Sequence, residues 1–195
     1  MSHYYTKDND RLDSDKRPVR FVVKGHQFTL NTDKGVFSKS GLDFGTRVLL
    51  ESIETKVPES VLDLGCGYGP IGIVIKKLYG SKVTMVDIND RAVKLATENG
   101  KLNFVTINVL QSDGFSAVTG KFDWIITNPP IRAGKQVIYG WFDQARDFLN
   151  DTGHLIIVIN KNQGAPSAIT YLNTIYSKVD VIAKKSGYHV ISCQK

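Results

Sequence analysis

The chain has 195 residues, of which 42% are hydrophobic and 23% are charged, as in one ordinary globular domain with a sizeable core. Its apolar runs are too short to span a membrane, and the N-terminus lacks the apolar segment of a signal peptide, so we expect a cytoplasmic protein. Lysine and arginine number 25 against 19 aspartates and glutamates, an excess that suits a polyanionic partner or simply a basic surface.

Predicted elements follow a polar N-terminal segment. Residues 1–20 mix both charge signs and are expected to form a mobile arm. An alternating strand over 26–32 and an amphipathic helix over 43–55 come next. Strands are then predicted at 60–64, 82–87, 103–109, 121–127, 153–160, 178–184 and 188–193, and helices at 70–79, 90–100, 137–149 and 167–176.

This alternation predicts a single α/β domain. Apolar strands that are buried on both faces and separated by single helices form a parallel sheet with helices on both sides. The last stretch, 188–193, is expected to be an antiparallel strand.

The first segment with chemical meaning is VLDLGCGYGPIG, residues 61–72. The strand is followed by three alternating glycines, and Pro70 opens the next helix, where a missing N–H costs nothing. Glycines allow a tight turn against which a ligand can lie, and a helix N-terminus favours a negative group. The pattern predicts a nucleotide-like cofactor site, with a tight turn that binds no ligand as the alternative.

The glycine spacing distinguishes between cofactors. Dinucleotide-binding loops read G-x-G-x-x-G, whereas this loop reads D-x-G-x-G-x-G from Asp63 and resembles the first motif of class I S-adenosylmethionine-dependent methyltransferases. Asp87, at the tip of the next strand, is placed to accept hydrogen bonds from ribose hydroxyls or to cap the following helix. Asp113 occupies the position that meets the adenine amino group in these enzymes, with an Asx-turn as the alternative.

The segment TNPPI, residues 127–131, ends a buried strand with two prolines that stiffen the backbone beside Asn128. Asn-Pro-Pro tetrapeptides at this place resemble the catalytic motif of methyltransferases that act on planar nitrogen. The lone pair of such a nitrogen is delocalised, so two fixed acceptors, the Asn128 side-chain carbonyl and the Pro129 backbone carbonyl, would polarise its N–H groups. Pro130 and Ile131 would flank the substrate ring. The alternative is a rigid loop without chemistry.

Segments at 35–50, 61–72, 127–135 and 153–165 resemble the bacterial guanine-N(2) methyltransferases of small-subunit ribosomal RNA, in a short single-domain branch. The resemblance implies S-adenosylmethionine as cofactor and RNA as partner, either ribosomal RNA or a small-subunit particle. The cofactor contacts that it implies are at Phe37, Asp63, Gly65, Cys66, Gly67, Gly69, Asp87, Ile88, Asp113, Gly114 and Asn128.

The same resemblance implies one methyltransferase domain over 1–195. Residues 21–58 would cover the cofactor site, and 59–195 would form a Rossmann-like catalytic core. Its sheet is expected to have seven strands, mostly parallel with an antiparallel C-terminal strand, and helices on both faces.

Basic residues beside the predicted active loop are candidates for RNA binding. Arg132, Lys135 and Lys161 follow strand ends, so phosphates are their expected partners. For any single lysine the alternative is a solvated face. The histidines show no metal-ligand spacing, and Cys66 and Cys193 are expected to be reduced thiols.

Three other functions are alternatives to an RNA guanine-N(2) methyltransferase. A cofactor-binding assembly factor without activity is disfavoured by the joint presence of the glycine loop and NPPI, and a dehydrogenase is disfavoured by the glycine spacing. An N-methyltransferase that acts on protein glutamine or on adenine is the alternative substrate class. Those enzymes usually carry an aromatic residue where this chain has Ile131, but an aliphatic residue also stacks less well on an RNA base, so the substrate stays open.

Overall fold

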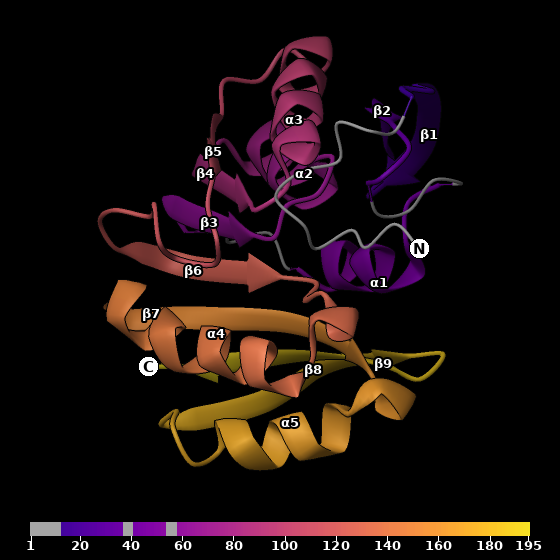
Figure 1. Ribbon diagram of the computed structural model, residues 1–195. Coiled ribbons are helices and arrows are strands. Elements are labelled where there is room, and N and C mark those ends of the chain that lie inside the picture. The colour runs from indigo at the N-terminus through magenta and orange to yellow at the C-terminus, as the bar shows by residue number, and fades with distance from the viewer. Residues whose placement is uncertain (1–12, 37–40, 54–57) are drawn as a thin grey trace.

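The computed structural model of the chain describes residues 13–36, 41–53 and 58–195 (Figure 1). The strands of its main sheet are β3 (Ser60–Leu64), β4 (Lys82–Asp87), β5 (Asn108–Gln111), β6 (Phe122–Thr127), β7 (Leu149–Asn160), β8 (Lys178–Lys185) and β9 (Tyr188–Gln194). They form a seven-stranded sheet in the order β5-β4-β3-β6-β7-β9-β8. Strands β3 to β7 pair in parallel, and β9 runs antiparallel to both β7 and β8. The predicted fold class is confirmed.

Helices cover both faces of this sheet (Figure 1). The helices are α1 (Phe44–Ser52), α2 (Pro70–Tyr79), α3 (Asp90–Leu102), α4 (Lys135–Phe148) and α5 (Ala165–Leu172), with short 3-10 turns η1 (Ile131–Ala133) and η2 (Lys161–Gln163). Helices α1 to α3 pack on one face and α4 and α5 on the other, each with its own apolar cluster. None of the helices in the described ranges is long and apolar enough to cross a membrane.

The central strands are apolar on both faces because each face is covered by helices. In β3, Val61 belongs to the cluster under α1 to α3, and Leu62 belongs to the cluster under α4 and α5. Ile125 and Ile126 of β6 divide between the two clusters in the same way. Alternate side chains of a strand point to opposite faces, so this pattern requires a sheet that is buried on both sides.

A hairpin of β1 (Arg17–Val23) and β2 (His26–Thr32) lies outside the main sheet. It corrects the expectation of a mobile arm over 1–20, because residues 17–20 begin β1; residues 1–12 are outside the described part. The charged RPVR sequence obscured an alternating strand whose inward residues, Val19, Phe21 and Val23, are buried.

Two strand boundaries also differ from the prediction. Strand β5 begins at Asn108 rather than at 103, because Phe104 adopts a φ of 57° in a turn after α3. Strand β7 begins at Leu149 rather than at 153, because Leu149 already pairs with Phe122 of β6. Element ends of this kind depend on pairing partners that local sequence does not specify.

Candidate active site

The carboxyl ends of the central parallel strands meet at a cavity of about 740 Å³. Its wall includes the glycine loop after β3, the end of β4, the loop after β5, the TNPPI loop after β6 and the first turn of α1. The predicted cofactor loop and the predicted catalytic loop therefore face one space. The predicted cofactor residues on its wall are Gly65, Cys66, Gly67, Asp87, Ile88, Gly114 and Asn128.

Hydrogen bonds tie the glycine loop to the end of β4. The N–H groups of Gly65 and Cys66 donate to the Val86 carbonyl over 2.8 and 2.9 Å. The N–H of Gly67 donates to the Asp87 carboxylate over 2.8 Å. Gly65 and Gly67 have φ values of 73° and 56°, a region that glycine enters without steric cost. The loop therefore has a defined shape beside the cavity.

Asp87 presents its carboxylate at the cavity wall. One oxygen accepts the Gly67 N–H, and the other accepts the Asn89 N–H over 2.9 Å. Burial raises the pKa of this carboxyl group, against the lowering effect of these N–H donors. An ionised carboxylate has about four acceptor sites, so both oxygens keep capacity for ligand hydroxyls. Helix α3 is capped by Asn89, whose side chain accepts from the Arg91 and Ala92 N–H groups, so the helix-cap alternative for Asp87 is wrong.

Asp63 and Gly69 are not among the residues on the cavity wall, and the direct cofactor contacts expected of them stay predictions. The Asp63 side chain has no exposed surface and lies under the loop, where its Oδ2 accepts the Gly72 N–H over 2.9 Å. Its Oδ1 has no partner among the described residues, and burial raises its pKa to about 7. Gly69 has a φ of 96°, and a Cβ there would lie 2.9 Å from atoms of Ile73 and Met85. Both residues therefore support the shape of the loop.

The loop after β5 reaches the cavity through Ser112 and Gly114. Asp113 between them is exposed and is not among the residues on the cavity wall, so its predicted contact with the cofactor stays a prediction. Its N–H donates to the Ser116 hydroxyl and its carbonyl accepts the Ser116 N–H, both over 3.1 Å. The backbone of Asp113 therefore opens a turn, and these two bonds do not involve the side chain that an Asx-turn would use. Phe37, also predicted at the cofactor, lies outside the described residues.

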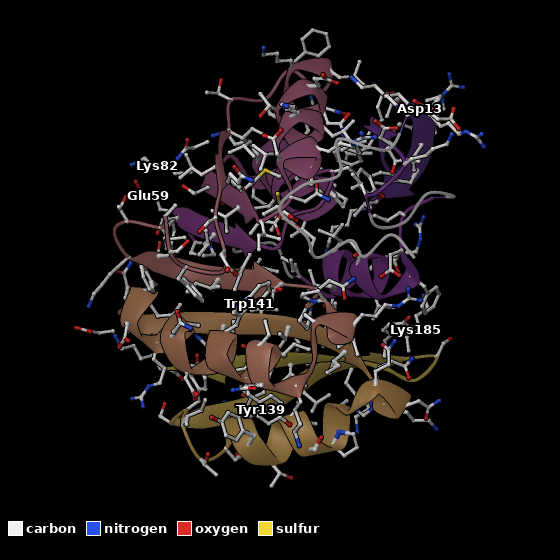
Figure 2. The ribbon with its side chains drawn as sticks, viewed as in Figure 1. Asp13, Glu59, Lys82, Tyr139, Trp141 and Lys185 are labelled. Atoms are coloured by element: carbon white, nitrogen blue, oxygen red, sulfur yellow. The ribbon has the colours of Figure 1, made fainter. Side chains whose placement is uncertain are left out.

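The indole of Trp141, which the sequence analysis did not single out, packs against two of the predicted glycines. Trp141 projects from α4 towards the sheet (Figure 2) and is 5% exposed. A Cβ at Gly114 would lie 2.8 Å from its Nε1, and one at Gly65 would lie 3.3 Å from its ring. Trp141 shares the inward face of α4 with Ile138 and Phe142, so helical periodicity predicts burial but not a place on the cavity wall.

The TNPPI loop is joined to β3 and to its own following turn. The Thr127 hydroxyl donates to the Leu64 carbonyl over 2.7 Å, which links the ends of β6 and β3. The Ala133 N–H donates to the Pro130 carbonyl over 2.8 Å, whereas the Pro129 carbonyl accepts no hydrogen bond from the part of the chain that the structure describes. The residues predicted to be catalytic all line the cavity: Asn128, Pro129, Pro130 and Ile131.

The side-chain amide of Asn128 is held from α1. Its Nδ2 donates to the Asp43 carboxylate over 2.9 Å and to the Thr46 hydroxyl over 3.0 Å. Sequence analysis missed both partners, although Asp43 stands at a typical N-cap position before an apolar helix. With both amide hydrogens engaged on α1, the Asn128 carbonyl oxygen is the side-chain atom left to accept a hydrogen bond.

Aromatic side chains join α1 to β9 beside the cavity. Tyr188 lines the cavity, and its ring centroid lies 5.7 Å from that of Phe44, which is 39% exposed. A Cβ at Gly45 would lie 2.7 Å from the Tyr188 ring, so only glycine permits this contact.

The predicted RNA-binding residues are exposed, but they differ in their distance from the cavity. Arg132 lines it. Lys161 lies in η2, where its N–H donates to the Gly187 carbonyl of the β8–β9 hairpin over 2.8 Å. Lys135 is not on the wall; its Nζ lies 4.9 Å from the centroid of the Tyr139 ring. Within 13–36, 41–53 and 58–195, no group of three or more histidines, cysteines, aspartates or glutamates is arranged to hold a metal ion.

The glycine loop after β3 and the TNPPI loop after β6, at the carboxyl ends of strands in a seven-stranded sheet, are arranged as in a methyltransferase fold. Residues 27–192 match the family model of the methyltransferase small domain, and the chain belongs to that family. It is 42% identical, over the whole of both chains, to the uncharacterized protein YbxB of Bacillus subtilis strain 168.

Several relatives have names that state an activity, and two of them are representative. The chain is 38% identical to ribosomal RNA small subunit methyltransferase C of Haemophilus influenzae strain PittEE, over 84% of this chain and 50% of that protein. Its fold matches that of the Thermus thermophilus 16S rRNA N2 G1207 methyltransferase RsmC, solved with AdoMet and guanosine, with a TM-score of 0.84 and 26% identity over 94% of this chain and 52% of that one. The chain thus spans about half the length of these two methyltransferases.

Proposed function

We propose that the protein is an S-adenosylmethionine-dependent methyltransferase that modifies the exocyclic 2-amino group of a guanine in ribosomal RNA. The observation that carries this proposal is the pairing of two available acceptors, the Asn128 side-chain carbonyl and the Pro129 backbone carbonyl, with a glycine loop on the wall of one cavity. The family and the named relatives support the same activity.

The residues of the loop suit this cofactor. Gly65 and Gly114 lack Cβ atoms, so the Trp141 indole packs directly against the loops, and all three residues line the cavity. Asp87 offers acceptors at the tip of β4 for the hydroxyls of a ribose. We therefore assign the cofactor to the space between these residues and the TNPPI loop. When bound, S-adenosylmethionine supplies an electrophilic methyl group next to a positively charged sulfur.

The TNPPI loop suits the methyl acceptor. An exocyclic amine conjugated to a ring is planar and a weak nucleophile, because its lone pair is shared with the ring. Hydrogen bonds from its two N–H groups to Asn128 and Pro129 would hold the nitrogen in place and favour the tetrahedral geometry that it adopts as the new bond forms. These acceptors are fixed before the substrate arrives, so no reorganisation opposes the reaction.

Pro130 and Ile131 complete this half of the cavity. Both are apolar and would contact the faces or edges of the base, and they exclude water from the acceptors. Exclusion of water strengthens the hydrogen bonds on which the polarisation depends. The proposed assignments of Asn128, Pro129, Pro130 and Ile131 from the sequence are kept for these reasons.

Guanine is favoured over the other acceptors by the relatives, since two acceptor oxygens alone would also suit adenine or a glutamine amide. The RsmC structure was solved with guanosine, and that enzyme is named for methylation of N2 of guanine 1207 in 16S rRNA. We carry that substrate class to this chain as part of the proposal. A base inside a duplex cannot reach a cavity of this kind, so the target must be unpaired or flipped out.

A route for RNA leads over the β8–β9 hairpin and η2. Lys161 and Lys184 are exposed there, and burial together with their two positive charges lowers the pKa of His189 between them. Arg132 adds a further positive charge at the cavity itself, and Tyr188 with Phe44 offers an aromatic surface at its edge. Positive side chains beside exposed rings are the usual means of holding single-stranded RNA.

The test has two parts with separate outcomes. Calorimetry with S-adenosylmethionine and with NADH should show binding of the first alone; binding of NADH alone would overturn the methyltransferase assignment. Incubation with deuterated-methyl cofactor and ribosomal RNA from a strain lacking the gene should then give N2-methylguanosine on mass spectrometry of nucleosides. Label on adenine or on protein glutamine would contradict the guanine assignment while keeping the enzyme class.

A further inference from the structure

The side-chain amide of Asn128 contacts the N-cap and the first turn of α1, which are far away in the sequence. Nδ2 of Asn128 donates one hydrogen bond to Asp43, separated by 85 residues, and one to Thr46, separated by 82 residues. Asp43 is on the cavity wall, and Thr46 is both on that wall and 3% exposed. Among the described residues, these two side chains are the hydrogen-bond partners of the Asn128 amide.

We propose that Asp43 and Thr46 are positioning residues that turn the carbonyl oxygen of Asn128, rather than its NH2 group, towards the methyl acceptor. This proposal rests on the proposed function, in which that oxygen accepts from the substrate amine. The two ends of an amide have nearly the same size and shape, so packing alone does not distinguish them and hydrogen bonds must.

Asp43 determines the orientation of the Asn128 amide, because a carboxylate only accepts hydrogen bonds. The group that faces it must therefore be the NH2 of Asn128. A hydroxyl both donates and accepts, so Thr46 is compatible with either orientation and adds strength to the one that Asp43 selects. A hydrogen bond to an ionised acceptor is also roughly twice as strong as one between neutral groups, so Asp43 should contribute more than Thr46.

A reversed amide would meet the substrate with the wrong polarity. The substrate amine presents N–H donors, and the reversed Asn128 would present donors of its own. The Pro129 carbonyl would then act alone. The prolines fix the backbone of the TNPPI loop, but they do not control rotation about the side-chain bonds of Asn128. The α1 contacts supply that control, and they also increase the negative charge on the carbonyl oxygen through a shared hydrogen-bonded chain.

The position of Asp43 is itself fixed. The same oxygen that accepts from Asn128 also accepts the Thr46 N–H over 3.0 Å and caps the first turn of α1. The Tyr188 ring against Gly45 holds this turn from the side. Any test must therefore separate the loss of a helix cap from the loss of the Asn128 contact.

Two matched pairs of variants make that separation. Asp43→Ser keeps a good N-cap but is too short to cap the helix and reach Asn128 together. Asp43→Asn keeps an oxygen acceptor of the same length, and the Thr46 N–H that this oxygen caps holds it, rather than the new NH2 group, on the side of Asn128. Thr46→Val removes the hydroxyl at constant shape, and Thr46→Ser restores it. Thr97→Val, on the exposed face of α3, serves as the control for a threonine hydroxyl that has no part in the site.

The single-turnover rate at saturating cofactor and RNA is the main measurement. We expect Asp43→Ser to lower it by about 10- to 100-fold and Thr46→Val by about 3- to 10-fold. Neither loss should exceed the loss of about 100-fold that is expected when the preorganised acceptor, Asn128, is itself removed. Asp43→Asn and Thr46→Ser should recover most of the rate. The dissociation constant for S-adenosylmethionine and the melting temperature should change little in every variant.

Equal rates for wild type and Asp43→Ser would overturn the proposal. So would equal losses in Asp43→Ser and Asp43→Asn, because that result would assign the effect to charge and not to orientation. A loss that appears only as weaker cofactor binding would do the same, since it would make α1 part of the cofactor site alone.

A second measurement does not depend on activity. In ¹⁵N NMR spectra of the cofactor-free protein, the side-chain NH2 of Asn128 should exchange slowly with water in wild type and Asp43→Asn, and quickly in Asp43→Ser. Fast exchange in the wild type would contradict the positioning role. A wild-type protein with slow exchange but no methyl transfer to RNA would instead overturn the proposed function and leave the contact intact.

Discussion

The two loops that face each other across the cavity are held rigid in different ways. The glycine loop depends on backbone conformations with positive φ and on a carboxylate from the adjacent strand, as in the bond from Gly67 to Asp87. The TNPPI loop depends on two prolines and on a helix that is far away in sequence, through the bonds from Asn128 to Asp43 and Thr46.

This difference teaches how the two halves of the site should respond to change. The cofactor half of the site, which comprises the glycine loop after β3 and Asp87 of β4, is built within neighbouring strands of the core. Substitutions there should weaken cofactor binding and lower the stability of the fold. The acceptor half, which comprises the TNPPI loop and its partners Asp43 and Thr46, depends on α1. Substitutions there should slow methyl transfer and leave cofactor binding unchanged. Substitutions in the two halves are therefore expected to have distinguishable effects on cofactor affinity and on the rate of methyl transfer.

The largest effect is expected for Asn128→Ala. Removal of one preorganised acceptor that acts mainly in the transition state should lower the single-turnover rate by at least about 100-fold. Cofactor affinity, measured by calorimetry, should stay nearly normal because the glycine loop is untouched. A variant that keeps most of its rate would show that the loop is only a stiff wall.

A pH effect on stability is expected from Asp63. Its folded pKa of about 7 lies above the ordinary value of 3.8, so the native protein binds this proton more tightly than the unfolded chain between those pH values. Stability from this group is therefore full below about pH 4 and is lost as pH rises through 7, with a change of about 2–3 kcal/mol between pH 5 and pH 8.

The measurement is urea unfolding across that pH range, with Asp63→Asn as comparison. Asparagine keeps an oxygen for the Gly72 N–H and cannot ionise, so the variant should lose most of this pH dependence and be at least as stable as wild type at pH 8. A residual slope of the same sign is expected from Asp87, whose pKa is also raised by burial. Parallel curves for the two proteins would contradict the assignment.

A smaller effect is expected for Asp87→Ala. Loss of the ribose acceptors and of the contact to Gly67 should weaken S-adenosylmethionine binding by about 1–2 kcal/mol. The neighbouring Asp90→Ala, which alters an exposed residue at the start of α3, is the control and should bind normally. Unchanged affinity in Asp87→Ala would remove this residue from the cofactor site.

The smallest effect is expected at the basic edge of the cavity. The double variant Arg132→Ala and Lys161→Ala should weaken RNA binding and reduce the slope of log K against log salt by roughly 1–2, while cofactor binding is kept. The control double variant, Lys82→Ala and Lys121→Ala, removes the same charge at the opposite ends of β4 and β6: Lys82 begins β4 (Figure 2) and Lys121 directly precedes β6. If both double variants changed the slope equally, net charge alone would explain RNA binding.

The sequence predicted those features of the molecule that depend on local pattern. The parallel sheet followed from apolar strands between single helices, and both loops were recognised from residues that are adjacent in the chain. Strand β1 was missed because the charges of Arg17 and Arg20 obscured the alternation of Val19 and Phe21. The burial of Asp63 was missed because the side chain turns under its own loop.

The acceptor half was predicted less fully, for a physical reason. The contact from Asn128 to Asp43 spans 85 residues, and its geometry exists only after α1 packs beside β7 and β9. Likewise, the apolar periodicity of α4 predicts that Trp141 is buried, as it does for every core position of that helix, but it does not predict a place on the cavity wall. Helical periodicity fixes which face is buried, but it does not say which loop that face will meet.

The most direct test of methyl transfer through Asn128 compares ribosomal RNA from three strains: one lacking the gene, one complemented with the wild-type gene, and one complemented with Asn128→Ala. Nucleoside mass spectrometry should show one N2-methylguanosine restored by the wild type and absent, or nearly so, in the other two. Full restoration by Asn128→Ala, at equal protein level, would contradict the account.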